Sequence, residues 1–328
     1  MNNEQNFVFI ITGPTASGKT AFADQLAQLL DCEVINVDVG QFYTPLSVGT
    51  AKPDWKKFAY PCHLFDILDE PKDLTVVQYR TMVLEKVKEI QNRGRTPVLV
   101  GGSLFYIKSI FFPPHKLEQH DSPREELFDH LKSEELWDFL NSIDPDRAAQ
   151  IHKNDTYRLK RALAIWQTTG QKPSTFVPAL KIPFNTVLVS IVPKRDVLRD
   201  RIKQRTVEMI EKEGWIDEAR TLMGTQWEDF LHTKGLIGYP EIFEWLKNGA
   251  HRDQLDVLIN TIQLETIHYA KRQLTFLNGF IQLIKKHQEY NKQEEFIIIA
   301  EKLEQITKQE IEQIATLTKR LGKNKDLR

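Results

Sequence analysis

The chain is poor in cysteine, in long apolar runs and in excess charge of either sign. Its two cysteines, Cys32 and Cys62, have neither a metal-ligand nor a disulfide spacing, which favours a reducing compartment. The longest apolar run near the N-terminus, Phe7–Ile11, is too short for a signal peptide or a membrane span. We therefore expect a cytoplasmic protein that has no membrane partner.

The balance of charge restricts the possible partners. The sequence has 44 basic and 45 acidic residues, a net charge of −1, which argues against nonspecific binding of nucleic acid over the whole surface. A local basic groove stays possible, because salt screens charges beyond about 10 Å. A length of 328 residues allows one large α/β domain, or a core with a smaller inserted domain.

Buried strands alternate with helices along most of the chain. The predicted strands are Phe7–Thr12, Glu33–Asp38, Pro97–Val100 and Thr186–Val192. A helix is expected from about Lys19 to Leu30, and an amphipathic helix that opens with a capping box is expected at Thr75–Arg93. Strand–helix–strand order with this spacing predicts parallel pairing in a doubly wound sheet.

The composition of the sequence changes between the strands predicted at Pro97–Val100 and Thr186–Val192. Residues 115–183 are charged and helical in pattern, lack strand signals and end in a stretch with several prolines. Such a block predicts an inserted all-helical domain, with residues 1–114 and 184–328 as the catalytic core. The core continues with a charged helix at about Asp196–Glu213, a long helix at about Asp253–Phe280 and a helix-like stretch at Glu295–Leu321.

A glycine-rich loop follows the first predicted strand. Gly13–Thr20 matches the G-x-x-x-x-G-K-[ST] pattern of a P-loop, with a strand before it and a helix after it. Its backbone N–H groups and the helix N-terminus form an anion site; Lys19 adds a full charge and Thr20 offers a hydroxyl to Mg²⁺. The residues expected to bind a diphosphate or triphosphate are Gly13, Thr15, Ala16, Ser17, Gly18, Lys19 and Thr20.

The P-loop alone does not specify a reaction. Most P-loops bind ATP or GTP and pair with an acidic residue at the end of a neighbouring strand. The strand at Pro97–Val100 runs into Gly101-Gly102-Ser103 without a carboxylate, so Asp38 is the strand-end acid close to the loop in sequence. Metal ligation, proton abstraction and a purely local backbone cap are all possible roles for Asp38, and the motif does not decide among them.

An ordered series of motifs between about residues 8 and 280 resembles the tRNA dimethylallyltransferase family. The series comprises the P-loop, Val37-Asp38, Gln41-Phe42-Tyr43, Val48–Pro53, His63–Ile67, Gly101-Gly102-Ser103 with Tyr106, Ile151–Asp155 leading to Arg158 and Arg161, Ile237-Gly238-Tyr239 and Ala270–Gln273. The chain departs from the family pattern at Val39, Gly40, Ile267 and Asn278. It also lacks the zinc-finger tail of eukaryotic members, which indicates a bacterial type.

The resemblance implies a P-loop NTPase-like fold and a defined reaction. The dimethylallyl group of dimethylallyl diphosphate is transferred to N6 of adenosine 37, beside the anticodon, in tRNAs that read codons starting with U. The P-loop would hold the leaving diphosphate with Mg²⁺, and Asp38 would be the general base. The resemblance further implies catalytic roles for Ser103, Lys19 and Arg205, with Arg201 one helical turn before Arg205.

The same resemblance implies how tRNA is bound. The acceptor base has to leave the anticodon-loop stack to reach a buried donor. The inserted domain would grip the anticodon stem-loop, and the enzyme is expected to act as a monomer. The residues expected to contact tRNA are Gln41, Tyr43, Thr50, Lys52, Arg158, Arg161, Lys271 and Arg272.

Three other functions remain open from the sequence. A small-molecule kinase would use the P-loop for phosphoryl transfer, but it leaves the motifs between Asp38 and Pro53 unexplained. An adenylate isopentenyltransferase of the cytokinin-forming type would not need the inserted domain. An RNA-binding protein without activity would fit the departures at Val39 and Asn278.

Overall fold

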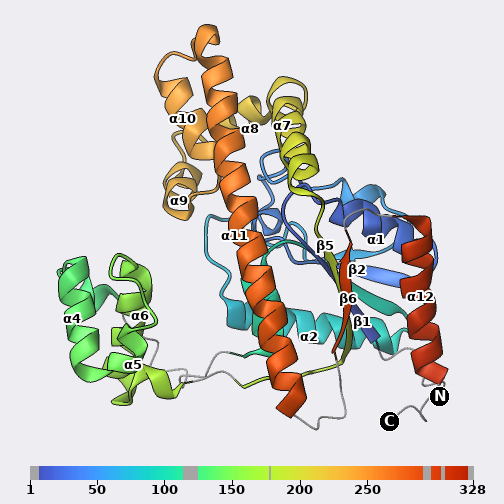
Figure 1. Ribbon diagram of the computed structural model, residues 1–328. Helices are drawn as coiled ribbons and strands as arrows, with labels where there is room; N and C mark the ends of the chain where they lie inside the picture. The colour runs from blue at the N-terminus through green and yellow to red at the C-terminus, as the bar shows by residue number, and fades with distance from the viewer. Residues whose placement is uncertain (1–6, 114–124, 177–178, 291–296, 304–306, 324–328) are drawn as a thin grey trace. The chain divides into compact units, whose positions relative to one another are not determined.

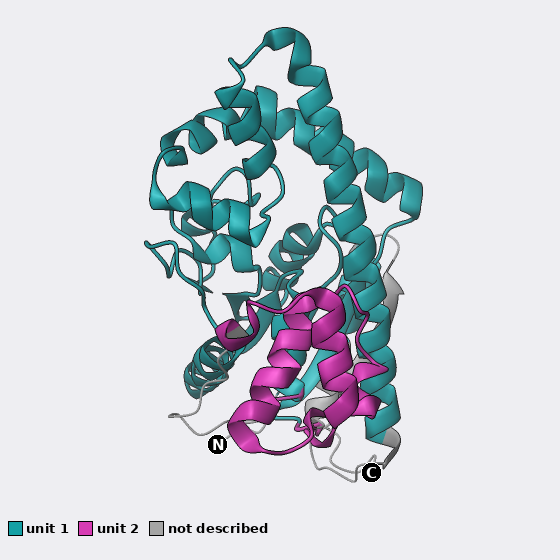
Figure 2. Ribbon diagram, turned by 90° about the vertical axis from the view of Figure 1, so that its left-hand side faces the viewer, with its two compact units in different colours: residues 1–111, 182–328 teal, residues 112–181 magenta. Residues whose placement is uncertain are grey.

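The computed structural model describes residues 7–113, 125–176, 179–290, 297–303 and 307–323. The chain divides into two compact units, which Figure 2 colours separately. Unit 1 consists of Met1–Phe111 and Ile182–Arg328, and unit 2 of Phe112–Lys181. The boundaries expected from the sequence lie a few residues later, after residues 114 and 183.

Unit 1 is built on a six-stranded parallel sheet in the order β3-β2-β4-β1-β5-β6. The strands are β1 (Phe7–Thr12), β2 (Cys32–Asn36), β3 (Cys62–His63), β4 (Thr96–Val100), β5 (Asn185–Ile191) and β6 (Ile297–Leu303). All six residues of β1 and all five of β2 are buried, as expected for strands covered on both faces. The predicted parallel α/β sheet is confirmed.

One expectation for the C-terminal part of the chain is wrong. The stretch Glu295–Leu321 reads as helix-like in sequence, but its first part is β6, which pairs with β5 from Thr186↔Ile297 onward. A helix, α12 (Lys308–Lys323), follows. A short apolar run has no period that separates strand from helix, so pairing with a strand more than a hundred residues earlier decides its conformation.

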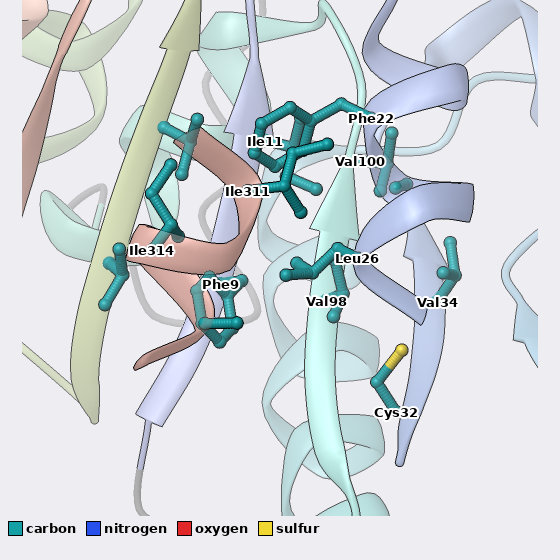
Figure 3. Packing of buried hydrophobic residues seen from close by; sticks show 14 of the residues in the cluster. Phe9, Ile11, Phe22, Leu26, Cys32, Val34, Val98, Val100, Ile311 and Ile314 are labelled. Atoms are coloured by element: carbon teal, nitrogen blue, oxygen red, sulfur yellow. The ribbon is translucent and has the colours of Figure 1, made fainter. Parts of the chain in front are cut away.

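Helices α1 (Lys19–Ala27) and α12 cover one face of the sheet. Figure 3 shows the hydrophobic cluster between them and the strands. It joins Phe9, Ile11, Val34, Val98 and Val100 of the strands to Phe22 and Leu26 of α1 and to Ile311 and Ile314 of α12. Full burial of side chains of this size contributes roughly 1.5–3 kcal/mol each. The cluster therefore fixes α1, and with it the P-loop, against the sheet.

Helices α2 (Val76–Asn92), α3 (Leu104–Phe111) and part of α11 (Leu255–Tyr290) lie on the other face. The capping box expected at the start of α2 is confirmed: Gln78 N donates to Thr75 Oγ1 at 3.2 Å, and Thr75 N donates to Gln78 Oε1 at 2.9 Å. The buried residues of α2 are Tyr79, Val83, Val87 and Ile90. The sheet is thus covered on both faces, as in a doubly wound fold.

The remaining helices of unit 1 gather around the first part of α11, at the top of Figure 1. They are α7 (Arg195–Glu211), α8 (Trp215–Leu222), α9 (Gln226–Lys234) and α10 (Tyr239–Lys247). A 3₁₀ turn, η1 (Val39–Phe42), follows β2. Among the helices that the structure describes, none is both long and apolar enough to cross a membrane.

Unit 2 has its own hydrophobic core. Its elements are η3 (Glu125–Phe128), α4 (Ser133–Ile143), α5 (Pro145–Ala148), α6 (Thr156–Thr169) and η4 (Pro173–Thr175). Leu136 and Leu140 of α4 pack against Leu159 and Leu163 of α6, and all four side chains are fully buried. Over its described residues, 112–113, 125–176 and 179–181, unit 2 contains helices and no strand.

Candidate active site

Three loops meet at the carboxyl ends of adjacent strands. The P-loop follows β1, Asp38 follows β2, and Gly101-Gly102-Ser103 follows β4. Because β4 pairs with both β1 and β2, the three strand ends are neighbours in the sheet. The crevice outside the carboxyl ends of parallel strands is where open α/β sheets bind ligands.

The P-loop has the backbone of an anion site. Gly18 has φ 98°, a conformation that costs glycine little, and caps the N-terminus of α1. Lys19 is buried, and its Nζ donates to Gly13 O at 3.2 Å and to Pro14 O at 2.9 Å. Burial lowers the pKa of Lys19, and the nearby Asp38 carboxylate counteracts part of this shift. A bound anion would favour the protonated, positively charged form of this lysine.

Asp38 is held in a defined position by its neighbours. Its N–H donates to Asn36 Oδ1 at 2.9 Å, and Asn36 Nδ2 donates to Asp38 O at 3.2 Å. Ser103 Oγ accepts from Val39 N at 3.0 Å and makes a long contact of 3.5 Å to Asp38 Oδ1. Burial raises the pKa of Asp38, although Lys19 opposes the shift. A carboxylate with a raised pKa is a better proton acceptor than an ordinary aspartate.

Glycine is required where the loops after β2 and β4 touch. A Cβ on Gly101 would lie 2.3 Å from the carbonyl carbon of Val37. The two backbones are joined by hydrogen bonds from Val37 N to Val100 O at 2.8 Å and from Ser103 N to Val37 O at 3.1 Å. This close approach brings Ser103 beside Asp38.

Two arginines of α7 reach the P-loop. Arg205 Nη2 donates to Thr15 Oγ1 at 2.6 Å, and Arg201 Nη1 donates to Ser17 O at 3.3 Å. Burial lowers the pKa of Arg205, while Asp38 raises it. The structure therefore places both arginines beside the loop that the sequence analysis expected them to serve.

Gln273 of α11 joins two of the three loops, a role that sequence reasoning missed. Its Oε1 accepts from Thr15 N at 2.8 Å, and its Nε2 donates to Gly102 O at 3.0 Å. The side chain is only 6% exposed. The sequence placed Gln273 inside a family-like motif but gave no sign of these partners, which lie more than 170 residues earlier in the chain.

The loops enclose a pocket of about 430 Å³. All four residues predicted to be catalytic, Lys19, Asp38, Ser103 and Arg205, line it together. Its less polar wall includes Val39, Met209, Trp215, Leu236 and Ile237. A second cavity of about 460 Å³ adjoins the P-loop and is lined by residues 15–21, Asp38 and Arg201. The site can therefore hold a charged group and an apolar group side by side.

The residues expected to contact tRNA are distributed over both units. Gln41 and Thr50 line the pocket, and Gln41 Nε2 donates to Thr50 O at 3.2 Å. Arg272 also lines the pocket, and Lys271 beside it on α11 is exposed. In unit 2, α6 exposes Arg158 and Arg161.

Lys52 and Tyr43, also expected to contact tRNA, are held by contacts within the protein. The Lys52 side chain is 4% exposed, is paired with Asp66 and donates to Tyr43 O at 2.8 Å. Tyr43 is buried, and its hydroxyl donates to Lys72 O at 3.0 Å. Both side chains therefore tie the loop to its own surroundings instead of facing solvent, and their contact with tRNA stays a prediction.

Thr20, the expected Mg²⁺ ligand, is exposed at the start of α1 and lines the second cavity together with Asp38. The described part of the chain has no group of three His, Cys, Asp or Glu side chains that could hold a metal ion by itself. Magnesium usually takes one or two protein ligands and completes its shell with phosphate oxygens and waters. A hydroxyl and a carboxylate facing one cavity beside a P-loop fit such a cation.

The fold and the site define a class of protein: an α/β protein of P-loop-like fold with a glycine-rich loop, its lysine and an acidic group at one pocket. The family model described as IPP transferase matches residues 41–280, and the chain belongs to this family. That match begins at Gln41, so the P-loop and Asp38 precede it. The assignment of these two features rests on the geometry above.

Individual proteins extend the comparison over nearly the whole chain. The tRNA dimethylallyltransferase of Bacillus subtilis is 34% identical over 318 residues, covering 93% of this chain and 100% of the relative. The crystal structure of the full-length tRNA isopentenylpyrophosphate transferase of Bacillus halodurans matches with a TM-score of 0.63 and 30% identity, over 97% of this chain and 98% of that one. A eukaryotic dimethylallyltransferase captured acting on tRNA matches with a TM-score of 0.71 and 25% identity, over 90% and 74% of the two chains.

Proposed function

We propose that the protein is a tRNA dimethylallyltransferase, which transfers the dimethylallyl group of dimethylallyl diphosphate to N6 of adenosine 37 in tRNAs reading codons that start with U. The observation that carries the proposal is the meeting of a P-loop lysine, Lys19, with the carboxyl group of Asp38 in one pocket. Membership of the IPP transferase family and similarity to named tRNA dimethylallyltransferases support this chemistry.

The reaction makes one bond and breaks one bond at the same carbon. N6 attacks C1 of the dimethylallyl group, and the C1–O bond breaks so that diphosphate leaves with the electron pair. The proton lost from N6 goes to Asp38, whose raised pKa suits it to accept a proton. The atoms and charges then balance, with dimethylallyl-adenosine, diphosphate and a protonated carboxyl group as the products of the step.

The residues around the P-loop stabilise the charge that develops on the leaving diphosphate. Lys19, Arg205 and the N-terminal amides of α1 act where this charge is largest, which lowers the barrier. Mg²⁺, held by Thr20 and the phosphate oxygens, would supply additional positive charge there. The Ser103 hydroxyl, 3.5 Å from Asp38 Oδ1, would help to orient this carboxylate.

The acceptor adenine has to be extruded from the anticodon loop to enter this pocket. Gln41 and Thr50 would form the wall that meets the base, since both line the pocket. Lys271 and Arg272 on α11, and Arg158 and Arg161 on α6, offer exposed cations for phosphates of the anticodon stem-loop. We further propose that the enzyme works in the cytoplasm, since its two cysteines are free, as is usual in a reducing compartment, and that it acts as a monomer.

The proposal is tested with labelled dimethylallyl diphosphate, Mg²⁺ and unmodified tRNA containing adenosines at positions 36, 37 and 38. Parallel reactions contain free AMP, or ATP, as the acceptor. Label should appear in tRNA and in neither nucleotide. Label in AMP would favour an adenylate isopentenyltransferase, and ATP turnover without prenyl transfer would favour a kinase; either result refutes the proposal.

A further inference from the structure

A carboxylate of α8 holds three successive backbone amides of a distant loop. Glu218 Oε2 accepts from Ser47 N at 2.8 Å and from Val48 N at 2.7 Å, and its Oε1 accepts from Gly49 N at 3.0 Å. The same Oε1 accepts from the hydroxyl of Tyr239 at 2.6 Å. Four donors on one carboxylate form a strong, charge-assisted cluster, which fixes the conformation of residues 47–49.

The packing around this cluster leaves no space for a side chain at Gly49 or Gly238. A Cβ on Gly49 would lie 2.2 Å from Trp215 Nε1 and 2.6 Å from Tyr239 Oη. A Cβ on Gly238 would lie 2.0 Å from Trp215 Cζ2. The indole of Trp215 therefore touches the backbone at both glycines, and the family-like motifs at Val48–Pro53 and Ile237–Tyr239 interlock here with α8.

The fixed loop continues directly into the wall of the active-site pocket. Thr50 follows Gly49, and its carbonyl accepts from Gln41 Nε2 at 3.2 Å. Gln41 N in turn donates to Asp38 O at 3.0 Å. One hydrogen-bonded path therefore leads from Glu218 through residues 47–50 and Gln41 to Asp38.

We infer that Glu218 is a positioning residue for the acceptor adenine. It does not line either cavity at the P-loop. In the described part of the chain, its carboxylate is bonded to the 47–49 loop and to Tyr239. Glu218 therefore sets the position of Thr50 and Gln41 in the wall of the pocket that receives the base, whereas its own hydrogen bonds go to residues outside the P-loop. The inference rests on the proposed function, because it assigns this wall to the acceptor.

Glu218→Gln is the informative change, since it keeps the size of the side chain but cannot accept from all four donors. The matched control is Asp217→Asn on the same helix, because Asp217 is exposed and pairs with its helical neighbour Arg220. Glu218→Gln should lower kcat/KM for tRNA by about tenfold or more, as expected for the loss of charge-assisted hydrogen bonds. The Kd for pyrophosphate, measured by calorimetry without tRNA, should change less than twofold. Asp217→Asn should match the wild type in both measurements.

A second readout follows the base itself. A fluorescent purine analogue at the acceptor position of an anticodon stem-loop brightens when the base leaves the stack. The wild type should produce this increase, and Glu218→Gln should bind the RNA with a much smaller increase. Tyr239→Phe removes one of the four donors and keeps the ring, so it should show the same pattern with a smaller loss.

Each outcome decides between the inference and its alternatives. Unchanged kcat/KM and fluorescence in Glu218→Gln would overturn the inference. If Glu218→Gln also lost pyrophosphate binding, or if Tyr239→Phe weakened the binding of both substrates equally, the cluster would have a general role in folding. Either result would also overturn the inference. If the wild type transfers no prenyl group to tRNA, the proposed function fails as well, whereas transfer by a Glu218→Gln protein at the wild-type rate refutes only the inference.

Discussion

Replacement of Gln273 by methionine tests how the P-loop is held. The change keeps the approximate volume of the side chain but removes the bonds to Thr15 N at 2.8 Å and to Gly102 O at 3.0 Å. A buried polar group left without a partner costs about 1–3 kcal/mol. Thr15 N is only partly buried, so the cost of leaving it without a hydrogen-bond partner falls at the lower end of this range. The expected total is about 2–4 kcal/mol for the two groups.

We expect this free energy to divide between global stability and the geometry of the P-loop. If about 1.4 kcal/mol falls on the loop, the Kd for pyrophosphate rises about tenfold. Gln263 supplies the matched control: it is also buried on α11, and its Nε2 donates at 3.2 Å to Lys203 O of α7 instead of to the P-loop. Gln263→Met should lower the free energy of unfolding without weakening the binding of pyrophosphate.

The assay is isothermal calorimetry with pyrophosphate and Mg²⁺, together with chemical denaturation of both variants. Gln273→Glu adds a third case, because it places a negative charge where the structure has a neutral amide. It should therefore weaken the binding of pyrophosphate more than Gln273→Met does. Equal pyrophosphate affinity in wild type and Gln273→Met, with a folded protein, would refute the role assigned to this side chain.

Four further predictions concern charged residues of the structure. Asp38→Ala should abolish prenyl transfer while tRNA binding, followed by gel shift, stays nearly intact; loss of binding in a folded protein would give Asp38 a role in recognition instead. Since burial raises the pKa of Asp38, the acid limb of the profile of kcat/KM against pH should lie above the usual carboxyl range near about 4, and Asp38→Glu should move it. Since burial lowers the pKa of Lys19, diphosphate affinity should fall with rising pH before the usual lysine range, and a flat alkaline profile would contradict this. Burial opposes the charge of Glu33, but hydrogen bonds from Arg93 and His63 lower its pKa to about 2. Its charge therefore contributes up to about 3 kcal/mol of stability near neutral pH, lost as pH falls below about 5. Denaturation of Glu33→Gln should show a deficit of this order at pH 7 that shrinks in acid.

Features that depend on short stretches of sequence were predictable. The boundaries of β1, the capping box of α2 and the P-loop follow from patterns within about twenty residues, where local chemistry decides the conformation. The sheet order β3-β2-β4-β1-β5-β6 and the edge strand β6 depend on pairing between distant segments, and no local pattern encodes this pairing.

The same distinction applies to the site. Lys19 and Asp38 were predictable from the P-loop and from the strand end, Ser103 and Arg205 from the family resemblance, and the structure brings all four into one pocket. Whether a charged side chain faces solvent was not predictable: Lys52 lies buried against Asp66 because the loop folds back on itself. The supporting residues were missed for a similar reason, since the partners of Gln273 and Glu218 lie about 170 or more residues earlier in the chain.

The central claim is that the P-loop holds a leaving diphosphate while the acceptor is N6 of an adenine in tRNA. The most direct measurement is mass spectrometry of nuclease fragments from tRNA incubated with the enzyme, Mg²⁺ and dimethylallyl diphosphate, with released pyrophosphate counted in the same reaction. The account predicts one five-carbon unit on adenosine 37 and pyrophosphate released in equal amount. A prenyl group at another position, or pyrophosphate released without modified tRNA, would contradict it.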